Sequence, residues 1–350
     1  LRRQAGDQQR AATDGVPLLA AALVAFNPQF VFTASLITND ALLAALGAAL
    51  LWLIAGGQPT PRRATALGLT LGLALITKQS ALIFVPLALA WCFIAGGWRD
   101  PQGQPWPTRL LNALFVCGGA AAIGGWWYLR NVQVYGDLFG LQLFQSEFIT
   151  QAFDATHPAA WAGALQTLHS SFWARFGWMN LPAPAWTYWV YGCLILFAVA
   201  GWMRSIDQTN SAPHWSLPAL PLLALAWLLS FALTAGLVAW QGRLLFPALA
   251  ALAVLLAHGL TRWQAARVTR VLPLGLFALA VWMPLGVIQP AYPFRTTTER
   301  AALAEPGVPT YARFARETEL GAVIRTWRID GPLRPGSTVT LTLVWNALSR

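Results

Sequence analysis

Apolar runs of membrane-spanning length alternate along the chain with short polar or charged segments. A transmembrane helix needs about 20 mainly apolar residues to cross the roughly 30 Å hydrocarbon core of a bilayer. The pattern therefore predicts an all-α polytopic membrane protein. The clearest runs lie at about 16–37, 41–56, 110–127, 187–203, 216–238, 244–260 and 271–288.

The apolar stretch from Pro61 to Gly97 is too long for one crossing, because as a single helix it would extend for about 55 Å. A polar turn at Thr77–Ser80 divides it into two spans, which brings the prediction to nine transmembrane helices. Nine spans also put the clustered loop arginines on one side of the membrane, which the positive-inside rule assigns to the cytoplasm. Those arginines are Arg2, Arg3, Arg10, Arg62, Arg63, Arg99, Arg109, Arg204, Arg262, Arg267 and Arg270.

The composition agrees with a membrane protein. Of the 350 residues, 57% are hydrophobic and 10% are charged, whereas soluble domains carry about 25% charged residues. A net charge of +10 would suggest nucleic acid in a soluble protein, but much of it lies in short loops, where it sets topology. No nucleic-acid partner is expected. The three cysteines lie in apolar runs without metal-ligand spacing and are interpreted as packing residues.

Three regions follow from these patterns. Residues 1–288 form the predicted transmembrane domain, 289–310 a linker, and 311–350 the start of an extracytoplasmic β domain with strand-like alternation. Residues 127–185 are aromatic and partly amphipathic, which predicts interfacial helices in a long outer loop, including one over 172–178. Because the chain does not begin with Met and its last strand pattern stops abruptly, we expect a piece of a longer protein that lacks its N-terminal part.

Isolated basic residues stand at the predicted outer ends of apolar helices: Lys78, Arg130, Arg175 and Arg243. Desolvation makes a cation costly there, and the phosphate of a lipid-linked sugar would explain it. Simpler interpretations remain open. Lys78 fits a snorkelling helix end, and Arg243 fits an ion pair with Asp137 or Asp40. For Arg175 the favoured role is a membrane-surface anchor.

Asp40 directly precedes an apolar helix and has two interpretations. Either it or Asn39 caps the helix N-terminus, or its carboxylate lies at the outer surface, where it would take a proton from an acceptor hydroxyl or ligate a metal. Further polar groups suited to phosphate or sugar oxygens and hydroxyls lie at two other outer segments. They are Arg130, Asn131, Tyr135 and Asp137 in the first segment, and Gln241 and Arg243 in the second.

Several strings, in this order, resemble the polytopic, lipid-carrier-dependent glycosyltransferases of the C-type fold, in particular bacterial members of the family-39 protein-mannosyltransferase-like group. The likeness covers roughly residues 16–290, and it rests on the order and loop placement of the strings rather than on any single string. They are Asn27–Phe30 with Ser35 and Asn39–Asp40, Gly68–Lys78, Trp126–Asn131 with Tyr135–Asp137, Phe172–Trp173 with Phe176–Trp178, and Gln241–Arg243 with Pro247.

The resemblance implies a multi-pass plasma-membrane enzyme that moves a sugar from a polyprenyl-phosphate carrier to an acceptor on the extracytoplasmic face. It implies that Asp40 supports an acid or base in a preceding outer loop, which we expect this sequence to lack, so the piece itself would be inactive. Lys78, Arg130 and Arg243 match basic positions suited to the carrier phosphate. No cofactor is assigned, a divalent metal is left open, and the acceptor is a glycan, lipid or protein.

Other functions share some of these features. A transporter or flippase of lipid-linked saccharides also needs apolar spans and cationic outer turns, but it predicts polar residues at mid-membrane depth, and the spans carry almost none. A polysaccharide polymerase or ligase would differ only in its acceptor. A non-catalytic membrane scaffold for the β domain is the remaining alternative.

Overall fold

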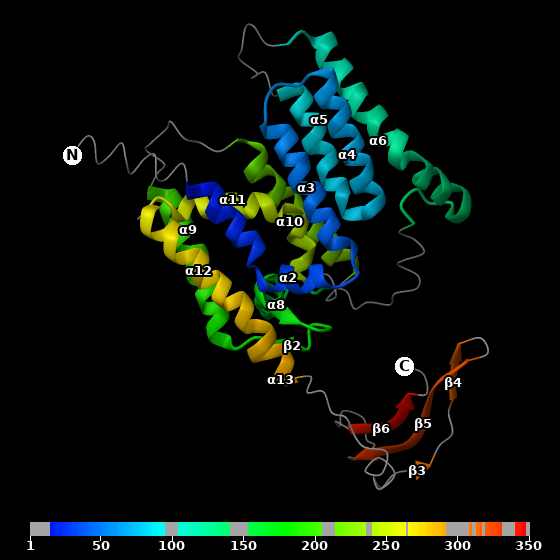
Figure 1. The fold of residues 1–350 in the computed structure, drawn as a ribbon. Helices are drawn as coiled ribbons and strands as arrows, with labels where there is room; N and C mark the ends of the chain where they lie inside the picture. The colour runs from blue at the N-terminus through cyan, green and yellow to red at the C-terminus, as the bar shows by residue number, and fades with distance from the viewer. Residues whose placement is uncertain are drawn as a thin grey trace. The chain divides into compact units, whose positions relative to one another are not determined.

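The computed structural model describes residues 15–94, 104–140, 153–204, 214–235, 240–263 and 265–291, and four strands between residues 308 and 347. Contacts within the chain divide it into two compact units, Leu1–Ala291 and Tyr292–Arg350. The first unit is built of helices and the second contains the longer strands (Figure 1).

The helices of the first unit begin and end close to the predicted apolar runs. They are Gly15–Ala25, α2 (Pro28–Ser35), α3 (Asn39–Ala55), α4 (Pro61–Thr77), η1 (Gln79–Ile83), α5 (Phe84–Ile94), α6 (Trp106–Tyr135), α8 (Pro158–Trp173), α9 (Ala185–Arg204), α10 (Ser216–Ala235), η4 (Gly242–Ala248), α11 (Leu249–Leu260), α12 (Ala265–Met283), η5 (Pro284–Ile288) and α13 (Gln289–Ala291).

Within the described residues, five helices are long and apolar enough to cross a membrane. A bent pair, Gly15–Ala25 with α2, gives a sixth if it counts as one span. Two further apolar helices, α3 and Gln79–Ile94, are shorter. The structure therefore supports an all-α polytopic membrane unit, while the count of nine spans stays a prediction.

The chain reverses direction at Lys78, as the sequence predicts. Helix α4 ends at Thr77, and the Trp91 indole near the end of α5 donates to the Gly57 carbonyl oxygen at 3.2 Å, close to where α4 begins. One end of this helix pair therefore holds Gly57 and Trp91, and the other holds Lys78. This reversal is the geometry that two crossings require.

Helix α6 is longer than predicted. It continues past residue 127 to Tyr135, because nothing in that stretch breaks a helix, and it ends where Gly136 adopts the left-handed conformation, with φ of 67°. Arg130, Asn131 and Tyr135 therefore lie on the helix rather than in a loop after it. The prediction that an outer loop starts near Trp127 is wrong in this respect.

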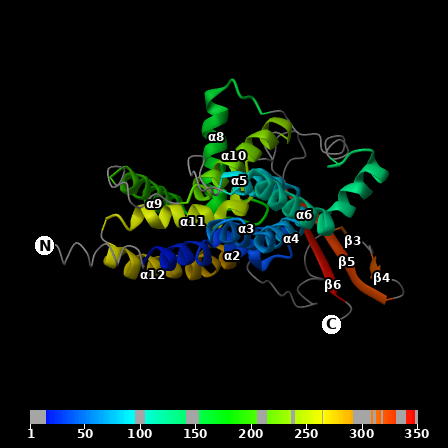
Figure 2. The same ribbon diagram turned by 90° about the horizontal axis from the view of Figure 1, so that it is seen from above.

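The first unit contains two large hydrophobic clusters that meet at the η4–α11 segment. One joins α3, α4, α5, α6 and α10, and the other joins Gly15–Ala25, α8, α9, α11 and α12. Figures 1 and 2 show the same grouping from two directions, with α3, α4 and α5 together and α9, α11 and α12 together. A third, smaller cluster packs α8 against α10. Segment η4–α11 is thus placed to bring residues of both large groups to one point.

The second unit contains an antiparallel four-stranded sheet in which β5 is central. Strands β3 and β4 pair with β5, and β6 also pairs with β5. Strand β3 lies inside the segment that the sequence assigns to a linker, so strand structure begins earlier than predicted. The strands are β3 (Val308–Pro309), β4 (Arg313–Arg316), β5 (Glu319–Asp330) and β6 (Thr340–Ala347).

Candidate active site

Asp40 and Lys78 form a partly buried ion pair at one end of the α3–α4 helix pair. Asp40 lies in the first turn of α3 and is 4% exposed, and the Lys78 ammonium donates to its Oδ1. The two helix ends are also joined through Asn39, whose amide donates to the Thr77 carbonyl oxygen at 3.0 Å. A carboxylate in this setting needs a cationic partner, because an unpaired buried charge is strongly unfavourable.

Arg243 brings a second cation to the same carboxylate. Its Nη1 lies 4.0 Å from Asp40 Oδ2, and its Nε donates to Gln241 Oε1 at 2.7 Å. Segment η4 reaches α3 because Gly47 has no side chain: a Cβ there would lie 2.5 Å from the Pro247 carbonyl oxygen. Two cations and one carboxylate leave this cluster with a net charge of about +1.

These contacts bear on the simpler interpretations that the sequence left open. The N-cap of α3 is Thr38, so neither Asn39 nor Asp40 occupies that position. Lys78 is 23% exposed and ion-paired, which excludes a merely snorkelling helix end. Arg243 contacts Asp40, one of the two partners in the simpler interpretation of this residue, and it is still 47% exposed, so its guanidinium has surface left for a ligand.

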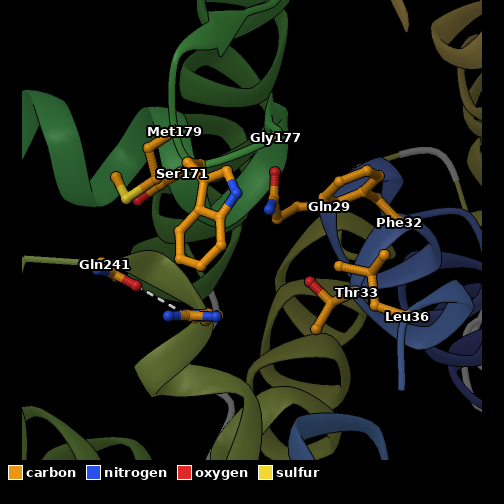
Figure 3. Close-up of a pocket in the computed structure, with 10 residues that line it drawn as sticks. Gln29, Phe32, Thr33, Leu36, Ser171, Gly177, Met179 and Gln241 are labelled. Carbon is orange, nitrogen blue, oxygen red and sulfur yellow. Dashed lines mark hydrogen bonds between the residues drawn. The ribbon is translucent and has the colours of Figure 1, made fainter. Parts of the chain in front are cut away.

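A small pocket of about 100 Å³ lies beside Arg243. Helix α2 lines one side of it, and α8 and the following turn line the other, with Gln241 on the side of Ser171 and Met179 (Figure 3). The wall residues are Gln29, Phe32, Thr33 and Leu36 on the first side, and Ser171, Gly177, Trp178 and Met179 on the second. The pocket thus combines amide, hydroxyl and aromatic groups next to a cation.

Hydrogen bonds fix the orientation of two polar groups around this pocket. Gln29 is buried, and its Oε1 accepts from the backbone N–H of Arg175 at 2.7 Å, so its amide nitrogen is turned into the space between the walls (Figure 3). The backbone N–H of Gly242 donates to the Ser171 hydroxyl at 2.8 Å, which couples η4 to α8. A Cβ at Gly242 would lie 2.2 Å from the Phe172 nitrogen, so this approach requires glycine.

The predicted interfacial helix over 172–178 is wrong in its second half. Helix α8 ends at Trp173, and a short hairpin follows, made of β1 (Arg175–Phe176) and β2 (Leu181–Pro182). Gly177 and Met179 adopt positive φ in its turn, a conformation that no α-helix contains. Arg175 Nε donates to the Met179 carbonyl oxygen at 2.7 Å, so this cation holds the hairpin turn.

The second predicted polar cluster, on α6, has contacts within α6 and with the turn that follows it. Arg130 lies over the rings of Trp127 and Tyr135, at 5.2 and 5.7 Å from their centroids. The Asn131 amide donates to the Leu138 carbonyl oxygen, and Asp137 Oδ1 accepts from the Phe139 backbone N–H. The structure thus brings together Asp40, Lys78, Gln241 and Arg243, whereas the α6 residues contact one another and the turn that follows α6.

Sequence reasoning assigned no role to Gln29, Ser171 or Trp178. Gln29 stands within the string Asn27–Phe30 and Trp178 within Phe176–Trp178, but nothing in either string shows that α2 and the hairpin face each other. No group of three or more His, Cys, Asp or Glu side chains suited to a metal ion occurs within the described ranges.

Comparison with known proteins supports a carbohydrate-transferring enzyme. Residues 10–119 match the family model described as dolichyl-phosphate-mannose-protein mannosyltransferase, a range that contains Asp40 and Lys78. No curated protein and no solved structure matches the chain. The family match and the apolar helices together support a membrane-embedded glycosyltransferase of the protein-mannosyltransferase type.

Proposed function

We propose that the protein transfers a sugar from a polyprenyl-phosphate carrier to an acceptor at the extracytoplasmic face of the plasma membrane. The observation that supports this most is the convergence of Lys78 and Arg243 on buried Asp40 beside a polar pocket. The family match over residues 10–119 supplies the class of reaction. The positive-inside pattern supports placing this end of the helices outside the cytoplasm.

The charge of the cluster suits the leaving group of this reaction. A polyprenyl-phosphate sugar is a phosphodiester with one negative charge. When the bond between the anomeric carbon and the phosphate oxygen breaks, the carrier departs as a monoester with a charge of about −1.5 to −2. A fixed net charge of about +1 at a poorly hydrated site stabilises that added charge more than it stabilises the bound donor. Arg243 is the more exposed cation and contacts the phosphate in this proposal.

Asp40 serves as a positioning residue. With Lys78 on one carboxylate oxygen and Arg243 near the other, it holds both cations at the membrane surface and is poorly placed to accept a substrate proton as well. The proton released by the acceptor hydroxyl therefore goes to another base, in line with the supporting role that the resemblance implies. As the new bond forms, that proton and the carrier phosphate leave as separate products.

The pocket beside Arg243 is the proposed site of the sugar ring. Its amide and hydroxyl groups match sugar hydroxyls, and the Trp178 indole, 98% exposed, offers an apolar face for the ring. The Gln29 amide nitrogen is the best-oriented donor, because the bond from Arg175 fixes its partner oxygen. With the phosphate at Arg243, the sugar attached to it would lie within this pocket.

Transfer in membranes tests the proposal. Membranes containing the protein are given radiolabelled polyprenyl-phosphate sugar, and labelled acceptor and carrier sidedness are both measured. An enzyme is supported if transfer falls at least about a hundredfold with Arg243→Ala. The control Arg62→Gln removes an exposed cation at the opposite end of α4 and leaves transfer unchanged. Movement of the carrier across the bilayer without transfer would instead identify a flippase.

A further inference from the structure

An apolar groove with two arginines at one end lies on the first unit, away from the candidate active site. It runs between α9 and α12 and reaches the last residue of α11. Its volume is about 720 Å³. The apolar lining comprises Val190, Cys193, Leu194, Phe197, Leu260, Trp263, Val268, Val271 and Leu272, and the two cations are Arg204 and Arg267.

The groove opens near the end of the helices that is opposite Asp40. From Arg243, the chain runs through η4 and α11 to Leu260, a distance of about 30 Å by helical rise. That distance equals the thickness of the hydrocarbon core. Arg204 and Arg267 therefore lie at the other membrane surface, which the positive-inside rule assigns to the cytoplasm.

Its dimensions match one leaflet of the bilayer. From Val190 to Arg204, the groove follows α9 for about 21 Å. Half of the hydrocarbon core is about 15 Å thick, and the headgroup region adds the remaining length. The floor is held by hydrogen bonds between α9 and the α11 end: Trp263 Nε1 donates to the Phe197 carbonyl oxygen at 2.9 Å, and Trp202 Nε1 donates to the Leu255 carbonyl oxygen at 2.9 Å.

The charges at the headgroup end are not neutralised within the described part of the chain. Arg204 is the last residue of α9, and Arg267 lies in the first turn of α12. Both are exposed, and among the described residues no acidic side chain forms an ion pair with either. Arg204 instead lies over the Trp263 ring, 5.4 Å from its centroid, which holds the guanidinium beside the groove. Guanidinium groups make strong charge-assisted hydrogen bonds to a phosphate.

We propose that this groove binds an anionic glycerophospholipid of the cytoplasmic leaflet. Its phosphate lies between Arg204 and Arg267, and one acyl chain lies along Val190, Cys193 and Phe197. Basic pockets between transmembrane helices on the cytoplasmic side recognise lipid headgroups in this way. The site is separate from the proposed sugar-transfer site and does not depend on it.

Native mass spectrometry of the purified protein tests the inference, with phosphatidylglycerol or phosphatidylcholine added at equal concentration. We expect one retained phosphatidylglycerol molecule, and at least about tenfold less retention in Arg204→Gln/Arg267→Gln. A matched control, Arg62→Gln/Arg270→Gln, removes two exposed arginines that do not line the groove and leaves retention unchanged.

A second variant covers the case in which the charge variant does not fold. Cys193 is exposed in the apolar part of the groove, so Cys193→Phe fills the path of the acyl chain, leaves both arginines in place and lowers retention. Cys117→Phe, at another exposed cysteine outside the groove, serves as its control. Equal retention of both lipids by the native protein, or unchanged retention in both groove variants, would overturn the proposal.

Discussion

Two clusters with similar sequence content have different structures in this protein. The first contains Asp40, Lys78 and Arg243, which come from α3, the end of α4 and η4 and converge on one buried carboxylate. The second contains Arg130 and Tyr135, which lie on a single helix and contact each other through an exposed cation–π pair. Each combines an outer cation with neighbouring polar or aromatic groups in the sequence.

The difference shows what makes a cation at a helix end informative. The Arg130 guanidinium makes cation–π contacts with aromatic rings of its own helix, which is an ordinary arrangement for an aromatic belt. Lys78 and Arg243 are held together by a residue far away in the chain, at a cost in desolvation that only a well-paired arrangement offsets. The convergent cluster is therefore the better candidate for function, and each experiment below tests that contrast.

The largest effect is expected from Asp40→Ala. Removing the carboxylate leaves Lys78 without its partner in a mostly buried position, which costs about 3–5 kcal/mol of unfolding free energy. Unfolding in mixed micelles measures it. The matched variant Asp330→Ala removes an exposed acidic residue and is expected to change stability by less than about 1 kcal/mol. Similar values for the two variants would contradict a structural ion pair at Asp40.

The ion pair itself is isolated by a double-mutant cycle on Asp40 and Lys78. If the two charges stabilise each other, Asp40→Ala/Lys78→Ala loses less stability than the sum of the single variants, with a coupling of about 1–3 kcal/mol. The same cycle on Asp40 and Arg130 is expected to give none. Equal coupling in both cycles would remove the distinction between the clusters.

Trp178→Ala is expected to weaken donor binding with little change in stability. The indole is 98% exposed, so its removal opens no cavity, but it takes away an apolar face beside the pocket. We expect KM for the lipid-linked sugar to rise about five- to tenfold, in the range of about 1–1.5 kcal/mol, with kcat within about twofold. A change confined to kcat would place Trp178 outside the sugar site.

Arg130→Gln is expected to have the smallest effect. An exposed cation–π contact is worth about 0.5–1 kcal/mol, so stability changes little and transfer falls less than about threefold. The resemblance, by contrast, implies that Arg130 holds the carrier phosphate. A loss of transfer as large as that of Arg243→Ala would support this implication and place α6 in the active site.

The sequence predicted the helical class and much of the helix order, because hydrophobic runs of spanning length have few structural alternatives. It also predicted the reversal at Lys78, since an unbroken helix from Pro61 to Gly97 would not fit the bilayer. It failed at the end of α6 and over 172–178, where aromatic residues suit a helix, a belt or a hairpin equally well. The hairpin depends on positive φ at Gly177 and Met179, and the second of these is not a residue that signals a turn.

The list of candidate site residues came from the sequence, because an isolated cation at an apolar helix end is unusual enough to be noticed. The sequence did not show which of these residues lie together. Asp40 and Arg243 are about 200 positions apart, and they meet because η4 packs closely on Gly47. A hydrogen bond from the Arg175 N–H to Gln29 joins α2 to the hairpin, and Gln29 and Trp178 line the same pocket. Hydrophobic pattern determines which segments enter the membrane, whereas only side-chain packing between helices determines which charges share a partner.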